Sequence, residues 1–573
     1  MTTRLGRAAL LGRTYGVSST HYLATEAGVQ ILRRGGTAID AGIAAGIALA
    51  VVERHVSDLG GVAPIILHRP GMPEPEAIDG LGRWPAELDL TAYLTRYDGT
   101  MPEGIPRSVT PAAVDAWLTA LERHGTLRLE DVCEPALELT QGFPVYPGLA
   151  SAIAAHAEIL RHWPSSAATF LPQGRPPRIG EFLVQPDLEK LLSRLTEVER
   201  AHAHQGREAG IRAARDEFYR GDVAERLVGF LREQGSPLDA TDLRDAEVAI
   251  GPGVATTYRG IQVHAHGPWS QGPLVPIVLK LLEGFDDLGG REPEDPLVAH
   301  RFLEAMKLAM ADREGFYGDP DLVDVPIDGL LHEGYLADRR TLIDDKIASP
   351  GLPLPGDPWS FMGRRGPRGY VPAARIGPSG PDTTYVCAMD REGNAFSATP
   401  SDSGLSAPLV PGLGIIVSTR GSQLWLDPEH PSAIAPRKRP RLTPNPALLT
   451  RNGQALMPFG CPGGDAQSQA MVQVASHIID RGLDVQDAIE RGRVLTFSAP
   501  DSFFPHGAQP GVVGAEAHLP ATTQRDLARR GHRLEVLDKW SPIAAAVCAV
   551  RRLDDGGLEA GADPRRASHA STW

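Results

Sequence analysis

Residues 38–53 constrain the fold of this chain more than any other segment. The run AIDAGIAAGIALAVVE has small and aliphatic residues on all sides of the helix that it predicts. It follows a shorter helix predicted over residues 24–36, which places Ala27, Ile31 and Leu32 on one face and ends in glycine. A helix that is apolar all round cannot face solvent, so we expect residues 38–53 to lie between the layers of a large core.

The rest of the chain up to about residue 350 is rich in predicted helices. With 573 residues, the chain has room for three or four domains of ordinary size or for one large layered core. Apolar periodicity predicts helices over 111–124, 131–141, 186–204, 297–312, 466–480 and near 520–530. A β-rich composition predicts strand-like runs at Pro64–His68, Ile261–His264 and 414–419.

Charge and cysteine content exclude several classes of function. The chain has 57 Lys and Arg against 71 Asp and Glu, a net charge of −14, which argues against nucleic acid and anionic membranes as partners. The four cysteines have neither a disulfide pattern nor zinc spacing, and the N-terminus lacks the apolar stretch of a signal peptide. We therefore expect a cytoplasmic protein without a metal or a cofactor.

Composition changes at residues 351–382, where seven Pro and seven Gly predict a long loop or linker. Directly after it, TTYVCAMD and AFSATP, joined by REGN, predict a hairpin that begins near Thr383. Taken alone, this pattern fits an exposed loop that enters a sheet, with Thr383 chosen for its β-propensity.

Ten segments in a fixed order resemble the γ-glutamyltranspeptidase family over nearly the whole chain. They are ILRRGGTAIDAGIAAGIALAVVE, DLGGVAPIIL, AIDGLGRWPA, EPALELTQGFPVYPGLA, YRGIQVHAHGPWSQG, EAMKLAMADREGFYGDP, DTTYVCAMDREGNAFSATPSDSGL, GIIVSTRGSQL, APRKRPRLTPNPALL and FGCPGGDAQSQ. The resemblance implies an α/β fold, the four-layer αββα sandwich of the N-terminal nucleophile hydrolases. It also implies a cut between Asp382 and Thr383, which leaves a large fragment (1–382, with the linker 351–382) and a small fragment (383–573) in one composite domain.

The chemistry required of Thr383 can be argued separately. A hydroxyl is a poor nucleophile at neutral pH and needs an adjacent base, which for an N-terminal threonine can be its own α-amine. That amine exists only after the Asp382–Thr383 bond breaks, and its usual pKa of about 7.7–8.0 leaves a useful fraction neutral. Thr384 is the rival nucleophile, but in the family pattern the first threonine of the pair acts.

The resemblance assigns further catalytic positions to Ser401, Gly463 and Gly464. Ser401, eighteen residues after Thr383, matches a position whose hydroxyl hydrogen-bonds the nucleophile. Its alternative is a turn serine after Pro400. Gly463 and Gly464 match glycines whose backbone N–H groups form an oxyanion hole, and a plain Gly-Gly turn is the alternative there.

The substrate-binding positions depart from those of true transpeptidases. The Gln and Asp that hold the substrate amine in γ-glutamyl enzymes are matched by Arg420 and Gln423, the carboxylate-binding Arg by Leu81 with Arg83 two positions later, and the paired serines by Leu442 and Thr443. These features look like the family branch of small-amide hydrolases that includes oxamate amidohydrolase. Ser403, Gln423 and Thr443 join Arg420 and Arg83 as candidate substrate-binding residues.

Arg420 has two interpretations of equal weight. Its planar guanidinium suits a carboxylate, which would indicate an acyl group that bears a carboxylate or a vicinal carbonyl near the scissile amide. Alternatively, it is a structural residue paired with an acid in its loop. The same two interpretations apply to Arg83.

The sequence therefore predicts a self-processing amidohydrolase that forms an acyl-enzyme on Thr383 and releases it to water. Its partners would be a small amide substrate and the two fragments of the chain, with a homodimer of the two-fragment unit as one assembly. Two rivals remain: a γ-glutamyltransferase or glutathione hydrolase, and an uncleaved, non-catalytic binding or scaffold member of the family.

Overall fold

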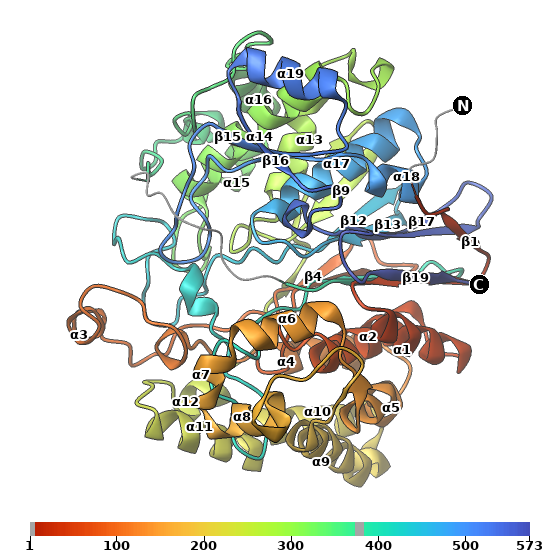
Figure 1. Cartoon of the computed structure of the whole chain (residues 1–573), viewed down its shortest axis with the longest axis vertical. Coiled ribbons are helices and arrows are strands. Elements are labelled where there is room, and N and C mark those ends of the chain that lie inside the picture. Colours follow the sequence, from red (N-terminus) through yellow and green to blue (C-terminus); the bar gives the residue numbers. More distant parts are fainter. Residues whose placement is uncertain (1–5, 373–382) are drawn as a thin grey trace.

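The computed structural model describes residues 6–372 and 383–573. In this part of the chain, two β-sheets pack face to face and a layer of helices covers the outer face of each (Figure 1). This order of layers confirms the αββα sandwich that the sequence predicts. The last ten residues of the predicted linker, 373–382, which include Asp382, lie outside the described residues.

Both large sheets draw strands from either side of Thr383. In the described residues the first sheet has seven strands in the order β1 (Leu10–Gly12), β18 (Leu558–Ala562), β17 (Cys548–Arg552), β13 (Gln454–Gly460), β12 (Ala447–Arg451), β9 (Ile261–Ala265) and β8 (Val254–Tyr258). The second sheet also has seven, in the order β19 (His569–Thr572), β2 (Tyr15–Ser19), β10 (Val386–Asp390), β11 (Ala395–Ala398), β3 (Ile65–His68), β4 (Glu76–Ile78) and β7 (Ile250–Gly251). A chain cut before Thr383 would therefore keep both fragments in each sheet.

The helices divide by sequence between the two outer layers (Figure 1). The layer beside the second sheet contains α1 (Tyr22–Arg33), α2 (Ala38–Val52), α3 (Leu90–Arg96), α4 (Ala113–His124), α5 (Leu129–Thr140), α6 (Pro147–Ala155), α7 (Ala157–Arg161), α8 (Pro164–Phe170), α9 (Pro186–His202), α10 (Arg207–Arg220), α11 (Asp222–Glu233) and α12 (Ala240–Arg244). The other layer contains α13 (Leu274–Glu283), α14 (Pro296–Phe316), α15 (Ile327–Leu330), α16 (Glu333–Arg340), α17 (Ala466–Arg481), α18 (Val485–Glu490) and α19 (Ala521–Arg530). Two small sheets complete the described fold, β14 (Val494–Thr496), β15 (Val512–Glu516) and β16 (Arg533–Leu537) in one, β5 (Phe143–Pro144) and β6 (Phe182–Leu183) in the other.

Helix α2 is the buried helix that its composition predicts. All fifteen of its residues are buried, between β10 and β11 on one side and neighbouring helices on the other. Its N-terminus is closed by a capping box between Thr37 and Asp40. A Cβ atom at Gly42 would lie 2.1 Å from Cδ1 of Phe396, so the glycine lets the helix approach the sheet.

The predicted hairpin is present and occupies the middle of the second sheet. Strands β10 and β11 pair antiparallel, with Val386 opposite Ala398, and are flanked by β2 and β3. Thr383 lies three residues before β10, where it forms an isolated antiparallel bridge with Ser401, which is also bridged to Val62. The hairpin therefore carries Thr383 and Ser401 to the same edge of the central layers.

The strand predicted over residues 414–419 is wrong. This segment is buried, with Ile415, Ile416 and Val417 fully inaccessible, but it belongs to no strand of the described chain. Its backbone bonds go to loops and side chains instead: Ile416 N donates to Asp58 Oδ1 (3.3 Å), and Val109 N donates to Ser418 O (2.9 Å). A short buried apolar run has the same sequence pattern whether or not it pairs in a ladder.

Among the described helices, none is both long enough and apolar enough to cross a membrane.

Candidate active site

Thr383 and Ser401 bring their hydroxyl groups together inside the protein. Both residues are fully buried, and the Ser401 hydroxyl donates to Thr383 Oγ1 at 2.9 Å. Backbone bonds between Ser401 and Val62 (2.9 and 3.2 Å) and from Thr384 N to Pro400 O (3.1 Å) hold the two segments in register. The contact predicted for Ser401 is thus present, and a turn serine with a solvent-facing hydroxyl does not describe it.

The hydroxyl of the rival nucleophile, Thr384, is engaged elsewhere. It hydrogen-bonds the hydroxyl of Thr20 and the carboxylate of Glu53. Burial by itself would raise the pKa of Glu53, but the neighbouring His21 and His55 and the two hydroxyl donors hold that pKa below its usual value. A hydroxyl that donates to a buried carboxylate is held in a structural network, so the geometry favours Thr383 over Thr384.

Gln467, in the first turn of α17, is a neighbour of Thr383 that the sequence analysis missed. Its amide nitrogen is satisfied when it donates to Cys461 O (3.2 Å), Asn445 Oδ1 (2.9 Å) and Thr443 O (3.1 Å). In that orientation the carbonyl oxygen of Gln467 faces Thr383 Oγ1 at 3.5 Å. The available sequence signal was its place just after the glycine pair, where a helix begins.

Gly463 and Gly464 form the turn between β13 and α17. Their φ angles are +127° and +55°, values that favour glycine, and a Cβ at Gly463 would lie 2.7 Å from the Cβ of Ala545. The side chain of Gln271 fixes this turn, because its Nε2 donates to Gly464 O and to Thr443 O at 2.9 Å each. Gln271 is a second residue of the site that the sequence analysis did not single out.

Arg420 lies beside Ser401, in the short 3₁₀ turn Arg420–Gln423. Its Nη2 donates to Ser401 Oγ, its Nη1 donates to Gln423 Oε1 (3.3 Å), and its Nε lies 3.8 Å from Asp402 Oδ2. The guanidinium also lies over the ring of Phe503, and burial lowers its pKa. The contact with Asp402 fits the structural interpretation of Arg420, and its role toward a substrate carboxylate stays a prediction.

Three further predicted binding residues, Gln423, Thr443 and Ser403, differ in their burial and in their hydrogen-bond partners. Gln423 and Thr443 are buried next to Arg420, with Gln423 Nε2 donating to Thr443 Oγ1 at 3.1 Å. Ser403 is half-buried, and its hydroxyl accepts from Leu405 N (3.2 Å) inside its own turn.

Arg83 is placed by ion pairs on a different part of the molecule. Its guanidinium contacts Asp321 (2.7 Å) and Asp319 (3.3 Å), and its side chain is 36% exposed. Asp319 is fully buried and also pairs with Arg439 (2.7 Å). The described contacts of Arg83 therefore fit the structural interpretation and do not bring it to Thr383.

Two residues at which this sequence departs from the transpeptidase pattern, Leu81 and Leu442, lie in one apolar cluster. Leu81 and Leu442 pack with Val62 and Trp269, all at most 7% exposed. Val62 is the bridge partner of Ser401, so this cluster lies against the nucleophile segment. Apolar side chains thus occupy two positions that in transpeptidases bind the charged end of a γ-glutamyl group.

A cavity of about 470 Å³ opens beside the glycine pair. Its walls include apolar side chains, the first turn of α17, and Arg566, whose Nη1 donates to Thr383 O at 3.3 Å. Its lining includes Met310, Gly463, Gly464, Phe497, Ile543 and Arg566. The cavity therefore borders both the glycine turn and a residue in contact with Thr383.

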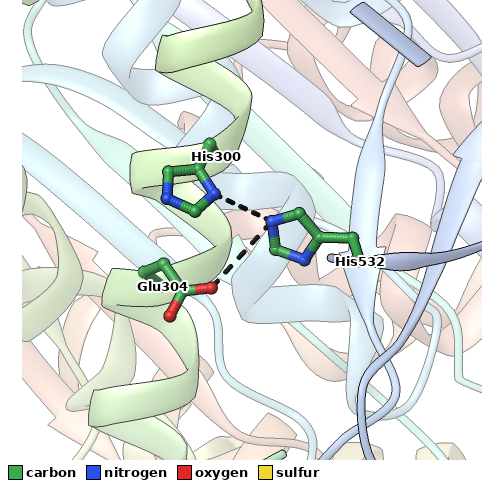
Figure 2. A group of neighbouring side chains, drawn as sticks. All are labelled: His300, Glu304 and His532. Atoms are coloured by element: carbon green, nitrogen blue, oxygen red, sulfur yellow. Dashed lines mark hydrogen bonds and ion pairs between the residues drawn. The ribbon is translucent and has the colours of Figure 1, made fainter. Parts of the chain in front are cut away.

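A separate cluster, His300, Glu304 and His532, has side chains of the kind that bind metals (Figure 2). His300 Nε2 donates to Asp344 O (2.8 Å), so its Nδ1 accepts from His532 Nε2 (2.9 Å). The buried ammonium of Lys307 lies 2.6 Å from Glu304 Oε1, where it supplies the positive charge that a metal would bring. We interpret the cluster as a hydrogen-bonded tie between α14 and the start of β16.

The fold and the site together define an N-terminal nucleophile hydrolase, an enzyme that acts on amide bonds. The family model for gamma-glutamyltranspeptidase matches residues 24–573, and the chain belongs to this family.

The relatives of the chain span several amide-cleaving enzymes. It is 32% identical to the oxamate amidohydrolase proenzyme of Klebsiella pneumoniae over 98% of this chain and 99% of that protein. It is 30% identical to the glutathione hydrolase-like YwrD proenzyme of Bacillus subtilis, covering 97% and 98%. The crystal structure of the cephalosporin acylase from Bacillus halodurans matches with a TM-score of 0.85 at 27% identity, covering 100% of this chain and 98% of that one.

Proposed function

We propose that the protein is a self-processing amidohydrolase that forms an acyl-enzyme on Thr383 and hydrolyses it. The observation that carries the proposal is the 2.9 Å contact between the hydroxyls of Thr383 and Ser401, inside an antiparallel bridge at the centre of the sandwich. The oxamate amidohydrolase and YwrD relatives are both called proenzymes, which supports synthesis as a precursor.

Each proposed step uses groups of this chain. Cleavage before Thr383 frees an α-amine, which takes the proton from Thr383 Oγ1 as that oxygen attacks the amide carbonyl. The developing oxyanion is stabilised by the backbone N–H groups of Gly463 and Gly464, while the Ser401 hydroxyl donates to Thr383 Oγ1. The amine then passes its proton to the leaving amine, and water attacks the ester to release the acid.

The apolar cluster supports an amide other than a γ-glutamyl one. Leu81 and Leu442 offer no charge to the amino and carboxylate groups of a γ-glutamyl substrate. The rival glutathione hydrolase activity requires those contacts, because a buried charged group without a partner costs several kcal/mol, on the order of the whole binding energy of a metabolite.

The first prediction concerns maturation. Wild-type protein should separate into fragments of 382 and 191 residues (573 − 382), with Thr383 at the new N-terminus in mass spectrometry. Thr383→Ala should remain one band on a denaturing gel, whereas Thr384→Ala should still be cleaved in part, because its hydroxyl serves the Glu53 network.

Normal processing of Thr383→Ala would contradict the nucleophile assignment. An uncleaved wild-type chain would favour the non-catalytic binding protein. Faster cleavage of γ-glutamyl-4-nitroanilide than of simple amides, with transfer to a dipeptide, would favour the transpeptidase rival.

A further inference from the structure

We propose that Arg566 binds a carboxylate of the substrate and that this substrate is a medium-sized amide, which fills the cavity beside Gly463 and Gly464. The inference rests on the proposed function of Thr383 and adds the class of substrate to it.

Arg566 connects the nucleophile with the cavity. It lies between β18 and β19, its Nη1 donates to Thr383 O at 3.3 Å, and its side chain forms part of the cavity wall. A guanidinium presents five N–H donors in a planar fork, so one side chain can contact both the Thr383 carbonyl and a carboxylate. A carboxylate held there would place the attached amide close to Thr383.

Charge within the cavity points to the same residue. Among the described residues that line it, Arg566 is the one cation. The wall also contains three acids. Asp465 is ion-paired with Arg313 and accepts from Ser502 N (2.7 Å), Asp501 Oδ1 accepts from Phe503 N (2.8 Å), and Glu535 is exposed to solvent. Burial lowers the pKa of Arg566, although the nearby Glu53 acts in the opposite direction, so the guanidinium lies in a desolvated site where an ion pair is screened less than at the rim.

Arg420 is the less suitable residue for this role. Its side chain is 2% exposed and does not line the cavity. Its donors reach Ser401 and Gln423, so removing it would disturb the hydroxyl that contacts Thr383 whichever substrate is bound. We therefore assign Arg420 to positioning Ser401, and Arg566 to substrate recognition.

The size of the cavity favours a substrate larger than a two-carbon acid amide. About 470 Å³ falls within the range of about 300–1,000 Å³ that encloses drug-sized ligands. Met310, Phe497 and Ile543 contribute apolar walls, which gain free energy only when an apolar part of the substrate covers them. The expected substrate thus combines a carboxylate with an aromatic or aliphatic part.

The test uses two matched pairs of amides, with release of the amine as the readout. Succinyl-4-nitroanilide and its methyl ester differ by a carboxylate on the acyl side, and N-phenylacetylglycine and its methyl ester by one on the amine side. Wild type should cleave the acid of one pair at least tenfold better in kcat/KM than the ester, and that pair identifies the side on which Arg566 binds. No preference in either pair would overturn the proposal.

Three arginine variants locate the preference. Arg566→Gln should reduce the ratio of acid to ester to near one, and Arg566→Lys should keep only part of it. Arg420→Gln should slow the acid and the ester by similar factors and leave their ratio unchanged. Arg451→Gln, at an exposed arginine paired with Asp554, is the matched control and should change neither rate. An unchanged ratio in Arg566→Gln would refute the assignment.

Cavity size is tested without touching Arg566. Ile543 is 54% exposed at the cavity, so Ile543→Trp should fold and fill part of the space. We expect kcat/KM for the phenylacetyl substrate to fall at least tenfold while that for oxamate stays within twofold. Equal changes of kcat/KM for the phenylacetyl substrate and for oxamate would overturn the size argument. This test does not depend on the Arg566 variants, so it remains decisive if those variants do not mature. Failure of the proposed function itself would appear separately, as wild type that does not release its N-terminal Thr383.

Discussion

At the scale of single residues, the candidate site is a chain of hydrogen bonds that ends on Thr383 Oγ1. Arg420 donates to Ser401, and Ser401 donates to Thr383 Oγ1, while Gln467 faces the same oxygen from α17. A charged donor polarises the hydroxyl that it contacts, so Ser401 becomes a better donor to an oxygen that gains negative charge. In the proposed function, this one hydroxyl would serve both maturation and turnover.

Ser401→Ala should therefore fold normally but slow both processing and turnover. The lost hydrogen bond is worth roughly 1–3 kcal/mol, and each 1.36 kcal/mol is about tenfold in rate. Gel assays of maturation and initial rates of the mature enzyme measure the two effects. Ser403→Ala is the control, because that hydroxyl serves only its own turn among the contacts described. Rates of Ser401→Ala within twofold of wild type would make Ser401 a structural residue.

At the scale of elements, helix α2 depends on glycine for its place against the sheet. Gly42 faces Phe396, and Gly46 faces Trp117, where a Cβ would lie 2.4 Å from the indole ring. Glycine in a helix costs about 1 kcal/mol relative to alanine, a cost that the close contact with aromatic rings offsets. The hairpin that carries Thr383 packs on this helix, so its position depends on the same contact.

Gly42→Ala should lower stability although alanine is the better helix former. The methyl group would meet Phe396 at 2.1 Å in a packed core, and overpacking costs about 1–3 kcal/mol, more than the gain of about 1 kcal/mol in propensity. Gly229→Ala in α11 is the control, since nothing lies within 4 Å of its Cβ and it should gain about 0.4–1 kcal/mol. A melting temperature of Gly42→Ala above that of wild type would contradict this account of α2.

At the scale of the whole molecule, the sandwich keeps many histidines neutral by burying them. Burial lowers their pKa values to about 3 or 4 at seven described positions, His21, His55, His264, His266, His430, His506 and His532. In the unfolded chain each has a pKa near 6.5. Between those values the unfolded state binds more protons than the native one, so stability falls as the pH falls.

The melting temperature should thus be nearly constant from pH 8 to 7 and fall steadily from about pH 6.5 to 4. Asp58 and Asp79, whose pKa values burial raises to about 6, act in the opposite direction, as do six other described carboxyl groups with raised pKa values. They are eight groups against twelve described histidines whose pKa is lowered, the seven above and His68, His300, His477, His518 and His569. His264→Gln should reduce the slope, and His162→Gln, at an exposed position, should not. A melting temperature that rises between pH 6.5 and 5 would refute this balance.

The sequence by itself determined several elements of the fold, the buried helix and the hairpin among them. The composition of residues 38–53 predicted a buried helix and the REGN turn predicted the hairpin, because each depends on local pattern. The sandwich was implied by the family resemblance of ten ordered segments and not by their pattern. Thr383 and Ser401 were assigned by the same resemblance, and the hairpin between them keeps the two residues close in space.

Only the tertiary structure decided the contacts between distant segments. It engages Arg420 with Ser401, ties Arg83 to Asp319 and Asp321, and leaves residues 414–419 without a ladder. It also brings Arg566, 183 residues further along the chain, to the carbonyl of Thr383. Such pairings depend on how sheets and loops pack, and a charged side chain takes whichever partner burial places beside it, so no local pattern in the sequence records the choice.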